Sequence, residues 1–217
     1  MKKEKILYRI LEEKIISIVR LKGSKMTSSV IDHLIQGGIK VLEVTSNTPN
    51  FDTEISKVRK KHPDILVGAG TITTSDLALK AIEAGAQFLV TPNTNKGIVD
   101  VAKQADIPVV MGAFTPTEIA DAIVFGADII KLFPANHLGT DYYRSLKGPF
   151  SNTKFFAVGG IGVDTMNDWF KAGIDGVGIG STLVPSGVGT EEELNAITIC
   201  ASKFVEHLKT ENGSIAD

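Results

Sequence analysis

Short apolar runs alternate with amphipathic stretches along the whole chain. Each run is rich in Val, Ile and Leu and carries few polar residues inside it, which is typical of parallel strands covered on both faces. Each amphipathic stretch is rich in Ala, Leu and Glu and often closes on glycine, which is typical of a helix and its C-cap. The pattern predicts strands at residues 14–20, 39–45, 65–70, 87–91, 107–112, 127–132, 154–158 and 174–179.

Three of the stretches between the strands carry clear helix signals. Residues 26–38 space their apolar side chains by three and four positions and stop at a Gly-Gly pair. Residues 74–86 open with N-capping side chains, and residues 115–127 open with a proline in the first turn. Each of the last two stretches also stops at a glycine, so all three predict helices with defined ends.

The two ends of the chain extend this plan. Residues 3–13 predict an extra helix before the first strand, and residues 187–210 predict a final helix that begins near Glu191. Residues 211–217 are expected to form a frayed end. Eight strands that alternate with helices predict a single (β/α)₈ TIM barrel with an extra N-terminal helix over residues 1–217. An open, doubly wound sheet is the alternative.

Charge and composition narrow the classes of partner. The 217 residues include 25 acidic and 23 basic side chains, for a net charge of −2 at neutral pH. Without a basic field or a basic run we expect no nucleic-acid partner, and an anionic ligand must be attracted by a few placed groups. The charged N-terminus is unlike a secretory signal, and no apolar stretch approaches the roughly 20 residues of a spanning helix, so we expect no membrane partner.

Cys200 is the only cysteine. A single thiol rules out an intrachain disulfide and fits a reducing, cytoplasmic location. Its place in the predicted final helix suggests a thiol packed in the core. The four histidines do not stand at metal-ligand spacing, and neither a Walker loop nor a complete GxGxxG fingerprint is present. We therefore expect no metal and no cofactor.

Polar residues gather where the predicted strands end, while the strand middles are apolar. In a (β/α)₈ barrel the active site lies at the carboxyl ends of the strands, built by the loops that follow them. This asymmetry therefore indicates an active site. The residues at the strand ends are Arg20, Glu43, Thr45, Asn47, Thr71, Thr91, Pro92, Gly112, Lys131, Phe133, Gly159, Gly160, Gly180 and Ser181.

Lys131 and Glu43 stand out because both lie inside apolar strands. Burial disfavours a charged ammonium and a charged carboxylate, so we expect the pKa of Lys131 to fall and the pKa of Glu43 to rise. A neutral lysine amine is a nucleophile, and a carboxyl group that titrates near neutrality can transfer protons. A simple buried ion pair between the two side chains is the structural alternative.

Two glycine-containing turns follow the seventh and eighth predicted strands, at Gly159-Gly160 and at Gly180-Ser181. Phosphate sites in such barrels use these two loops, whose backbone N–H groups point at the ligand. Glycine lets the backbone approach the ligand closely. Each turn alone marks no more than a tight turn, but the two together predict an anion site.

These residues and their motifs resemble the class I aldolases for 2-keto-3-deoxy-6-phosphogluconate and 4-hydroxy-2-oxoglutarate. The resemblance runs from about residue 14 to about residue 185, and the motifs follow the order they have in that family. The motifs are GIKVLEVT, VGAGTI, FLVTPN, MGAFTPTEI, IIKLFPA, AVGGI and GIGSTLV.

The resemblance implies a reaction and a role for each residue. Lys131 would form a Schiff base with the keto carbon, and Glu43 would be the acid/base. Cleavage would give pyruvate and an aldehyde such as glyceraldehyde 3-phosphate. The implied substrate contacts, with Thr71 at the pyruvyl carboxylate, are Arg20, Thr45, Asn47, Thr71, Pro92, Phe133 and Val158. The implied phosphate contacts are Gly159, Gly160, Gly180 and Ser181. The family is usually a homotrimer and uses no metal.

Two positions depart from the phosphogluconate branch of the family. Asn47 stands where that branch has an arginine for the substrate carboxylate, and an amide cannot give the bidentate, charge-assisted contact of an arginine. Val158 stands where that branch has a threonine before Gly-Gly. The phosphogalactonate branch resembles this chain at both positions, so the C4 epimer of the substrate stays open.

Two other functions are compatible with the barrel and the anion site. A metal-free phosphosugar isomerase or epimerase would use acid/base pairs without an imine-forming lysine, and it would release no pyruvate. A non-catalytic sugar-phosphate-binding barrel would bind its ligand without turnover.

Overall fold

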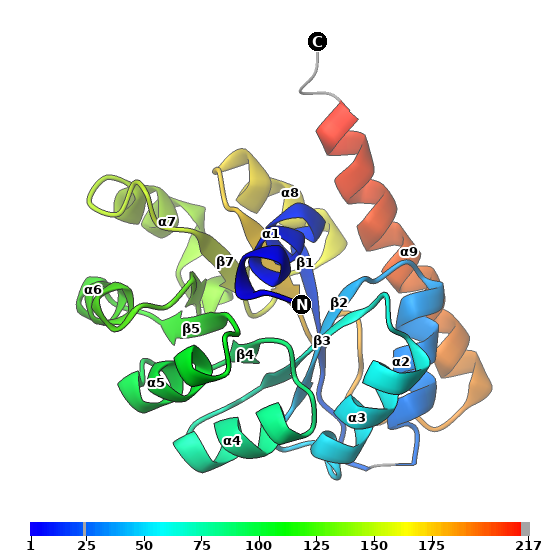
Figure 1. Cartoon of the computed structure of the whole chain (residues 1–217). Coiled ribbons are helices and arrows are strands. Elements are labelled where there is room, and N and C mark those ends of the chain that lie inside the picture. The colour runs from blue at the N-terminus through cyan, green and yellow to red at the C-terminus, as the bar shows by residue number, and fades with distance from the viewer. Residues whose placement is uncertain (24, 214–217) are drawn as a thin grey trace.

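The strands form a closed ring in the computed structural model, which describes residues 1–23 and 25–213 (Figure 1). Within these residues eight parallel strands pair in chain order, and the last pairs with the first. The strands are β1 (Ile15–Val19), β2 (Val41–Thr45), β3 (Leu66–Gly70), β4 (Leu89–Val90), β5 (Val109–Ala113), β6 (Ile129–Leu132), β7 (Phe155–Val158) and β8 (Gly176–Ile179). The predicted barrel is confirmed, and the open sheet is excluded.

Helices follow the strands and cover the outside of the ring, and one further helix precedes β1 (Figure 1). The helices are α1 (Lys3–Glu13), α2 (Thr27–Gln36), α3 (Phe51–Lys61), α4 (Ser75–Glu83), α5 (Lys96–Gln104), α6 (Pro116–Phe125), α7 (Gly139–Lys147), α8 (Val163–Lys171) and α9 (Glu191–Gly213), with a 3₁₀ turn η1 at Ala135–His137. The extra N-terminal helix is confirmed at the predicted residues 3–13.

The helix boundaries follow the capping chemistry in the sequence. The Thr115 hydroxyl accepts the Glu118 N–H, and the Glu118 carboxylate accepts the Thr115 N–H at 2.7 Å, so α6 begins with a complete capping box. The same helix ends at Gly126, whose φ of 96° suits a left-handed C-cap. At α4, the Thr74 hydroxyl accepts the Leu77 N–H. These local signals fix where each helix can start and stop.

All eight strands lie within two residues of their predicted limits, and β4, predicted at 87–91, is the shortest of them. Side-chain hydrogen bonds add to the backbone ones at both of its ends. The Gln87 amide oxygen accepts the Val67 N–H, and the Thr91 hydroxyl accepts the Gly112 N–H at 2.9 Å. The residues on either side of β4 are therefore hydrogen-bonded without belonging to the strand.

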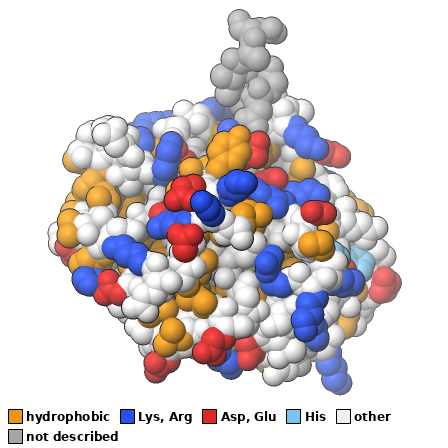
Figure 2. Space-filling view, viewed as in Figure 1, with side chains coloured by type: hydrophobic (Ala, Val, Ile, Leu, Met, Phe, Trp, Pro, Cys, Tyr) orange, Lys and Arg blue, Asp and Glu red, His pale blue; other side chains and the backbone are white. Residues whose placement is uncertain are grey.

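The core has two layers. The outer layer lies between the strands and the surrounding helices. The inner layer fills the barrel with side chains such as Val41, Phe88 and Phe156, and Ile6 and Ile10 of α1 pack against it. Helix α1 therefore closes the amino end of the barrel and leaves the carboxyl end for the site. On the face that carries α1, charges of both signs mix with apolar side chains (Figure 2).

Glycines on the inner face make room for the large side chains. A Cβ on Gly68 would lie 2.5 Å from the Phe88 ring, and a Cβ on Gly176 would overlap the Phe156 ring. Real Cβ atoms do not approach so closely, so these glycines are required by packing and not by a turn. Glycines therefore face large side chains across the barrel interior.

The C-terminal helix is longer than predicted. Helix α9 continues through Gly213, so residues 211–213 are helical, while residues 214–217 lie outside the described part. Cys200 packs against the core from α9, as predicted, but is only partly buried, with Sγ 3.7 Å from the carbonyl oxygen of Thr182. In the described residues no helix combines the length and the apolarity that a membrane crossing needs.

Candidate active site

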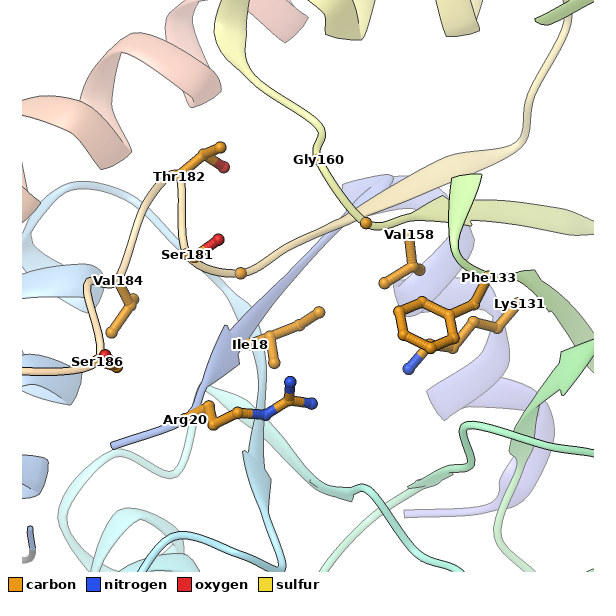
Figure 3. Close-up of a pocket in the computed structure, with 12 residues that line it drawn as sticks. Ile18, Arg20, Lys131, Phe133, Val158, Gly160, Ser181, Thr182, Val184 and Ser186 are labelled. Carbon is orange, nitrogen blue, oxygen red and sulfur yellow. The ribbon is translucent and has the colours of Figure 1, made fainter. Parts of the chain in front are cut away.

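A cavity of about 160 Å³ lies at the carboxyl ends of β1, β6, β7 and β8 (Figure 3). The predicted residues that line it are Arg20, Lys131, Phe133, Val158, Gly159, Gly160, Gly180 and Ser181. Ile18, Thr182, Val184 and Ser186 complete the lining and were not selected from the sequence. Two lining residues, Arg20 and Lys131, are basic and none of the twelve is acidic, so the cavity suits anionic ligands.

Lys131 reaches the cavity from the inner face of β6, where the neighbouring β5 presents Gly112 in register. The side chain is 3% exposed, and Nζ lies 5.0 Å from the centroid of the Phe133 ring (Figure 3). Burial lowers the pKa of Lys131, the nearby Glu43 opposes this, and the Arg20 charge lowers the pKa further. The site therefore favours the neutral, nucleophilic amine.

Glu43 enters from the inner face of β2 and is 1% exposed. Its carboxyl group packs over Gly70, where a Cβ would overlap it. Burial raises the pKa of Glu43, against the opposing charges of Lys131 and Arg20. Oε1 has no hydrogen-bond partner in the described structure, which is unusual for a buried polar atom and typical of a functional site.

The structural alternative of a simple Glu43–Lys131 ion pair is not what the structure contains. Among the described residues, no nitrogen–oxygen pair within 4.0 Å joins these two side chains. Across this longer distance the Lys131 charge still lowers the pKa of Glu43, and the Glu43 charge still raises the pKa of Lys131. The amine and the carboxyl therefore do not neutralise each other by contact, and Lys131 lines the cavity whereas Glu43 does not.

Thr71 is held in a strained backbone conformation beside the cavity. Its φ is 55°, in the left-handed region that threonine rarely adopts. Arg20 donates from Nη2 to Thr71 Oγ1 at 3.2 Å, and Ser46 Oγ donates to the Thr71 carbonyl oxygen at 2.7 Å. Arg20 and Thr71 thus form one polar unit at the end of β1 and β3. Sequence reasoning missed Ser46.

The loops after β7 and β8 present backbone N–H groups at the far side of the cavity. Gly159 and Gly160 have φ of 108° and 69°, which a glycine adopts without strain. The Gly180 carbonyl oxygen accepts the N–H groups of the residues three and four positions later, which closes a tight turn. Within the described residues the N–H groups of Gly160, Ser181 and Thr182 have no protein acceptor. Backbone N–H groups without a protein acceptor in the lining of a cavity suit an anion.

Four predicted substrate contacts do not line the cavity: Thr71, which reaches it only through Arg20, and Thr45, Asn47 and Pro92. Thr45 is fully buried, and its hydroxyl donates to the Val19 carbonyl oxygen at 3.2 Å and lies 3.1 Å from the Thr48 hydroxyl, so it joins β2 to β1. Asn47 is exposed on the loop after β2. The Pro92 backbone lies close to Gly112 of β5, and Pro92 follows β4, two strands away from Lys131 on β6.

The sequence of this chain is similar to those of several known proteins. The sequence matches the aldolase family described as KDPG and KHG aldolase over residues 6–200. The 2-dehydro-3-deoxy-phosphogluconate aldolase of Treponema pallidum (strain Nichols) is 34% identical over 157 residues, which are 72% of this chain and 75% of that protein. The 2-dehydro-3-deoxy-6-phosphogalactonate aldolase of Escherichia coli (strain K12) is 31% identical over 160 residues, which are 73% of this chain and 78% of that protein.

A solved structure agrees with these sequence matches. It is the KDPG aldolase from Legionella pneumophila with pyruvate captured at low pH as a covalent carbinolamine intermediate. It is 25% identical to this chain, covers 91% of this chain and 96% of its own, and superposes with a TM-score of 0.81. The family match spans most of the barrel, and the site at its carboxyl end pairs a buried amine with a buried carboxyl. The chain therefore belongs to the KDPG and KHG aldolase family.

Proposed function

We propose that this protein is a class I aldolase that cleaves a 2-keto-3-deoxy-6-phospho sugar acid to pyruvate and an aldehyde, with glyceraldehyde 3-phosphate as the aldehyde. The observation that carries the proposal is Lys131, an almost fully buried amine that opens into a cavity suited to anions. The carbinolamine named for the Legionella pneumophila relative supports the same covalent chemistry here.

The reaction begins with the neutral Lys131 amine, which attacks the keto carbon to form a carbinolamine. Loss of water gives a protonated imine, which withdraws electrons from the neighbouring C3–C4 bond. Glu43 as carboxylate takes the proton of the C4 hydroxyl while that bond breaks, so the aldehyde leaves and the bonding electrons form an enamine. The enamine is then protonated at C3, and hydrolysis of the imine releases pyruvate and the free amine.

The polar unit of Arg20 and Thr71 binds the substrate carboxylate in this proposal. Asn47 is exposed and lacks a charge, so it cannot replace the arginine of the phosphogluconate branch. Arg20 lines the cavity and already orients toward Thr71, at 3.2 Å between Nη2 and Oγ1. A carboxylate beside these two groups would receive charge-assisted hydrogen bonds.

The glycine loops bind the distal phosphate. Gly159, Gly160, Gly180 and Ser181 line the cavity opposite Arg20, and the unpaired N–H groups of Gly160 and Ser181 supply donors without a cation. Val158 lies between the amine and these loops and gives the middle of the substrate an apolar wall. Because Val158 offers no hydroxyl to the C4 region, the choice between the two C4 epimers follows from shape.

We further propose a homotrimer that works in the reducing cytoplasm. Three of the exposed large apolar side chains, Phe114, Ile123 and Val124, lie on or next to α6, which is typical of a surface that another subunit covers. The single cysteine, Cys200, supports a reducing compartment.

The deciding experiment is trapping with borohydride. Wild-type protein incubated with pyruvate and borohydride should gain one reduced pyruvyl group at Lys131, located by peptide mass spectrometry. Lys131→Met should gain none and lose turnover. Exposed Lys96→Met, which removes a surface lysine paired with Asp100, is the matched control and should behave as wild type.

Turnover should be measured beside it, as pyruvate release from the phosphogluconate and the phosphogalactonate forms of the substrate. Release from either form together with the adduct establishes the aldolase, and the faster form identifies the preferred epimer. Folded wild-type protein that neither forms the adduct nor releases pyruvate contradicts the proposal and favours the isomerase.

A further inference from the structure

The loops that follow β7 and β8 are joined by a side chain that the sequence does not single out. Thr182 Oγ1 donates to the carbonyl oxygen of Ile161 at 2.6 Å, from the loop after β8 to the loop after β7. On the other side, the Thr182 carbonyl oxygen is the partner of Cys200 Sγ on α9 at 3.7 Å. Figure 3 shows Thr182 next to Ser181, on the loop that neighbours Gly160.

This bond lies where the barrel ladder has ended. The strands β7 and β8 are paired as far as Val158 and Gly178. Beyond that point, in the described residues, the bond from Thr182 to Ile161 is the hydrogen bond that connects the two loops. The relative position of the Gly160 and Ser181 N–H groups therefore depends on it.

The Thr182 hydroxyl is itself a poor candidate for a phosphate contact. A threonine hydroxyl has one proton to donate, and here that proton goes to the Ile161 carbonyl oxygen. A phosphate dianion only accepts hydrogen bonds, so Thr182 could bind it only by giving up the bond between the loops. The residue lines the cavity, yet its side chain serves the loop and its backbone N–H remains free for a ligand.

We infer that Thr182 is a positioning residue, which holds the N–H groups of the two loops at the spacing that a distal phosphate requires. The inference rests on the proposed function for the identity of the phosphate, but the geometry that carries it is independent of the lysine chemistry. Preorganised donors bind an anion better than donors that must be brought together on binding. Loss of the bond should therefore affect the phosphate end of the ligand alone.

The test compares Thr182→Val, which removes the hydroxyl at nearly constant shape, with Thr182→Ser, which keeps it. Thr182→Val should raise KM for the phosphorylated substrate about tenfold, the usual weight of one hydrogen bond. Its kcat should stay within about twofold, and the pyruvate concentration that half-saturates borohydride trapping should not change. KM for the unphosphorylated 2-keto-3-deoxy acid should not change either, and Thr182→Ser should restore wild-type KM.

Thr198→Val is the matched control. Thr198 also donates its hydroxyl to a distant carbonyl oxygen, that of His33 at 3.2 Å, but between α9 and α2 and away from the cavity. We expect its KM values to equal those of the wild type. An equal loss for phosphorylated and unphosphorylated substrates in Thr182→Val, no loss for either, or failure of Thr182→Ser to restore KM would overturn the positioning role.

A binding measurement separates this inference from the proposed function. Titration of glycerol 3-phosphate, followed by nuclear magnetic resonance, needs no turnover and no Schiff base. Wild-type protein should bind it about tenfold more tightly than Thr182→Val. A wild-type protein that forms no pyruvate adduct contradicts the aldolase, whereas equal affinity of the two proteins, or no binding to the wild type, contradicts the role of Thr182.

Discussion

At the scale of single residues, the site keeps an amine and a carboxyl buried without joining them. Lys131 and Glu43 are each at most 3% exposed. Burial lowers the pKa of Lys131 and raises the pKa of Glu43, and both shifts favour the neutral forms. A contact ion pair would restore the charged forms and consume the nucleophile. In the proposed reaction, the separation of the two groups therefore keeps the lysine available for attack.

Replacing Glu43 by glutamine tests its part in proton transfer. Glu43→Gln keeps the shape over Gly70 but cannot take a proton, so turnover should fall by roughly 10²–10⁴-fold while the far-ultraviolet dichroism stays unchanged. Pyruvate release gives the rate. Wild-type turnover in the glutamine protein would remove Glu43 from the mechanism.

The pH dependence of adduct formation should report the lysine. The neutral amine attacks, so the rate of trapping should rise with pH through the pKa of Lys131, which burial holds below its ordinary value. Arg20 adds to that lowering, so Arg20→Met should raise the pKa of Lys131 and move the whole profile to higher pH. Trapping rates measured at saturating pyruvate across a pH series show the shift.

Lys22→Met is the control for that profile, since Lys22 follows on the same segment but lies outside the cavity lining. Its profile should coincide with that of the wild type. An Arg20→Met profile that moves to lower pH, or does not move, would show that the Arg20 charge does not act on the lysine.

Charged residues inside strands and glycine turns after strands were predictable from the sequence, whereas residues that act through hydrogen bonds to distant segments were not. Lys131 and Glu43 could be assigned to the site because a charged side chain is unusual inside an apolar strand. Ser46 and Thr182 act through hydrogen bonds to carbonyl groups 25 and 21 residues away, and nothing in the local pattern encodes such a partner. Thr45 was misplaced because its hydroxyl turns to the neighbouring strand instead of the cavity.

At the scale of elements, the inner faces of the strands fit together by pairing glycines with large side chains. Gly68 faces the Phe88 ring, and Gly176 faces the Phe156 ring. The sequence shows these glycines only as breaks in apolar runs. Their partners lie on other strands, so the packing could not be predicted without the barrel register.

A methyl group at Gly68 should therefore be costly. Gly68→Ala places Cβ 2.5 Å from the Phe88 ring and should lower the free energy of unfolding by about 1–3 kcal/mol, as overpacked cores do. Urea denaturation measures the loss, and Phe88→Leu in the same protein should recover part of it. Gly187→Ala, where a Cβ meets open space, is the control and should stay within about 0.5 kcal/mol of the wild type. Equal stability of Gly68→Ala and Gly187→Ala would rule out the pairing.

At the scale of the whole molecule, the repeat of strand and helix predicts the fold, but it does not predict the oligomeric assembly. The alternation of eight apolar runs with helical stretches leaves few topologies besides a barrel, and the closed ring confirms it. An interface between subunits leaves no such periodic trace. We place the proposed interface at apolar side chains that the fold leaves uncovered, including Val124 at 80% exposure.

The proposed trimer can be tested through that residue. Wild-type protein in light scattering should show a mass three times the 23.2 kDa of the chain, and Val124→Lys should show one chain or a concentration-dependent mixture, because burying an unpaired ammonium is unfavourable. Ile199→Lys, at 58% exposure on α9, should remain a trimer. A wild-type mass of one chain would contradict the assembly.

Because Ile6 and Ile10 of α1 close the amino end of the barrel, the products leave through the carboxyl end. In the proposed reaction Lys131 holds the pyruvyl half and is deeply buried, whereas Ser181 and Thr182 at the distal half are exposed. The aldehyde therefore stands between pyruvate and solvent and departs first. In the direction of synthesis the order reverses, so pyruvate binds first to the vacant site and the aldehyde binds second, between pyruvate and solvent. Pyruvate should then compete with the uncleaved sugar acid for the vacant enzyme, and the aldehyde should not.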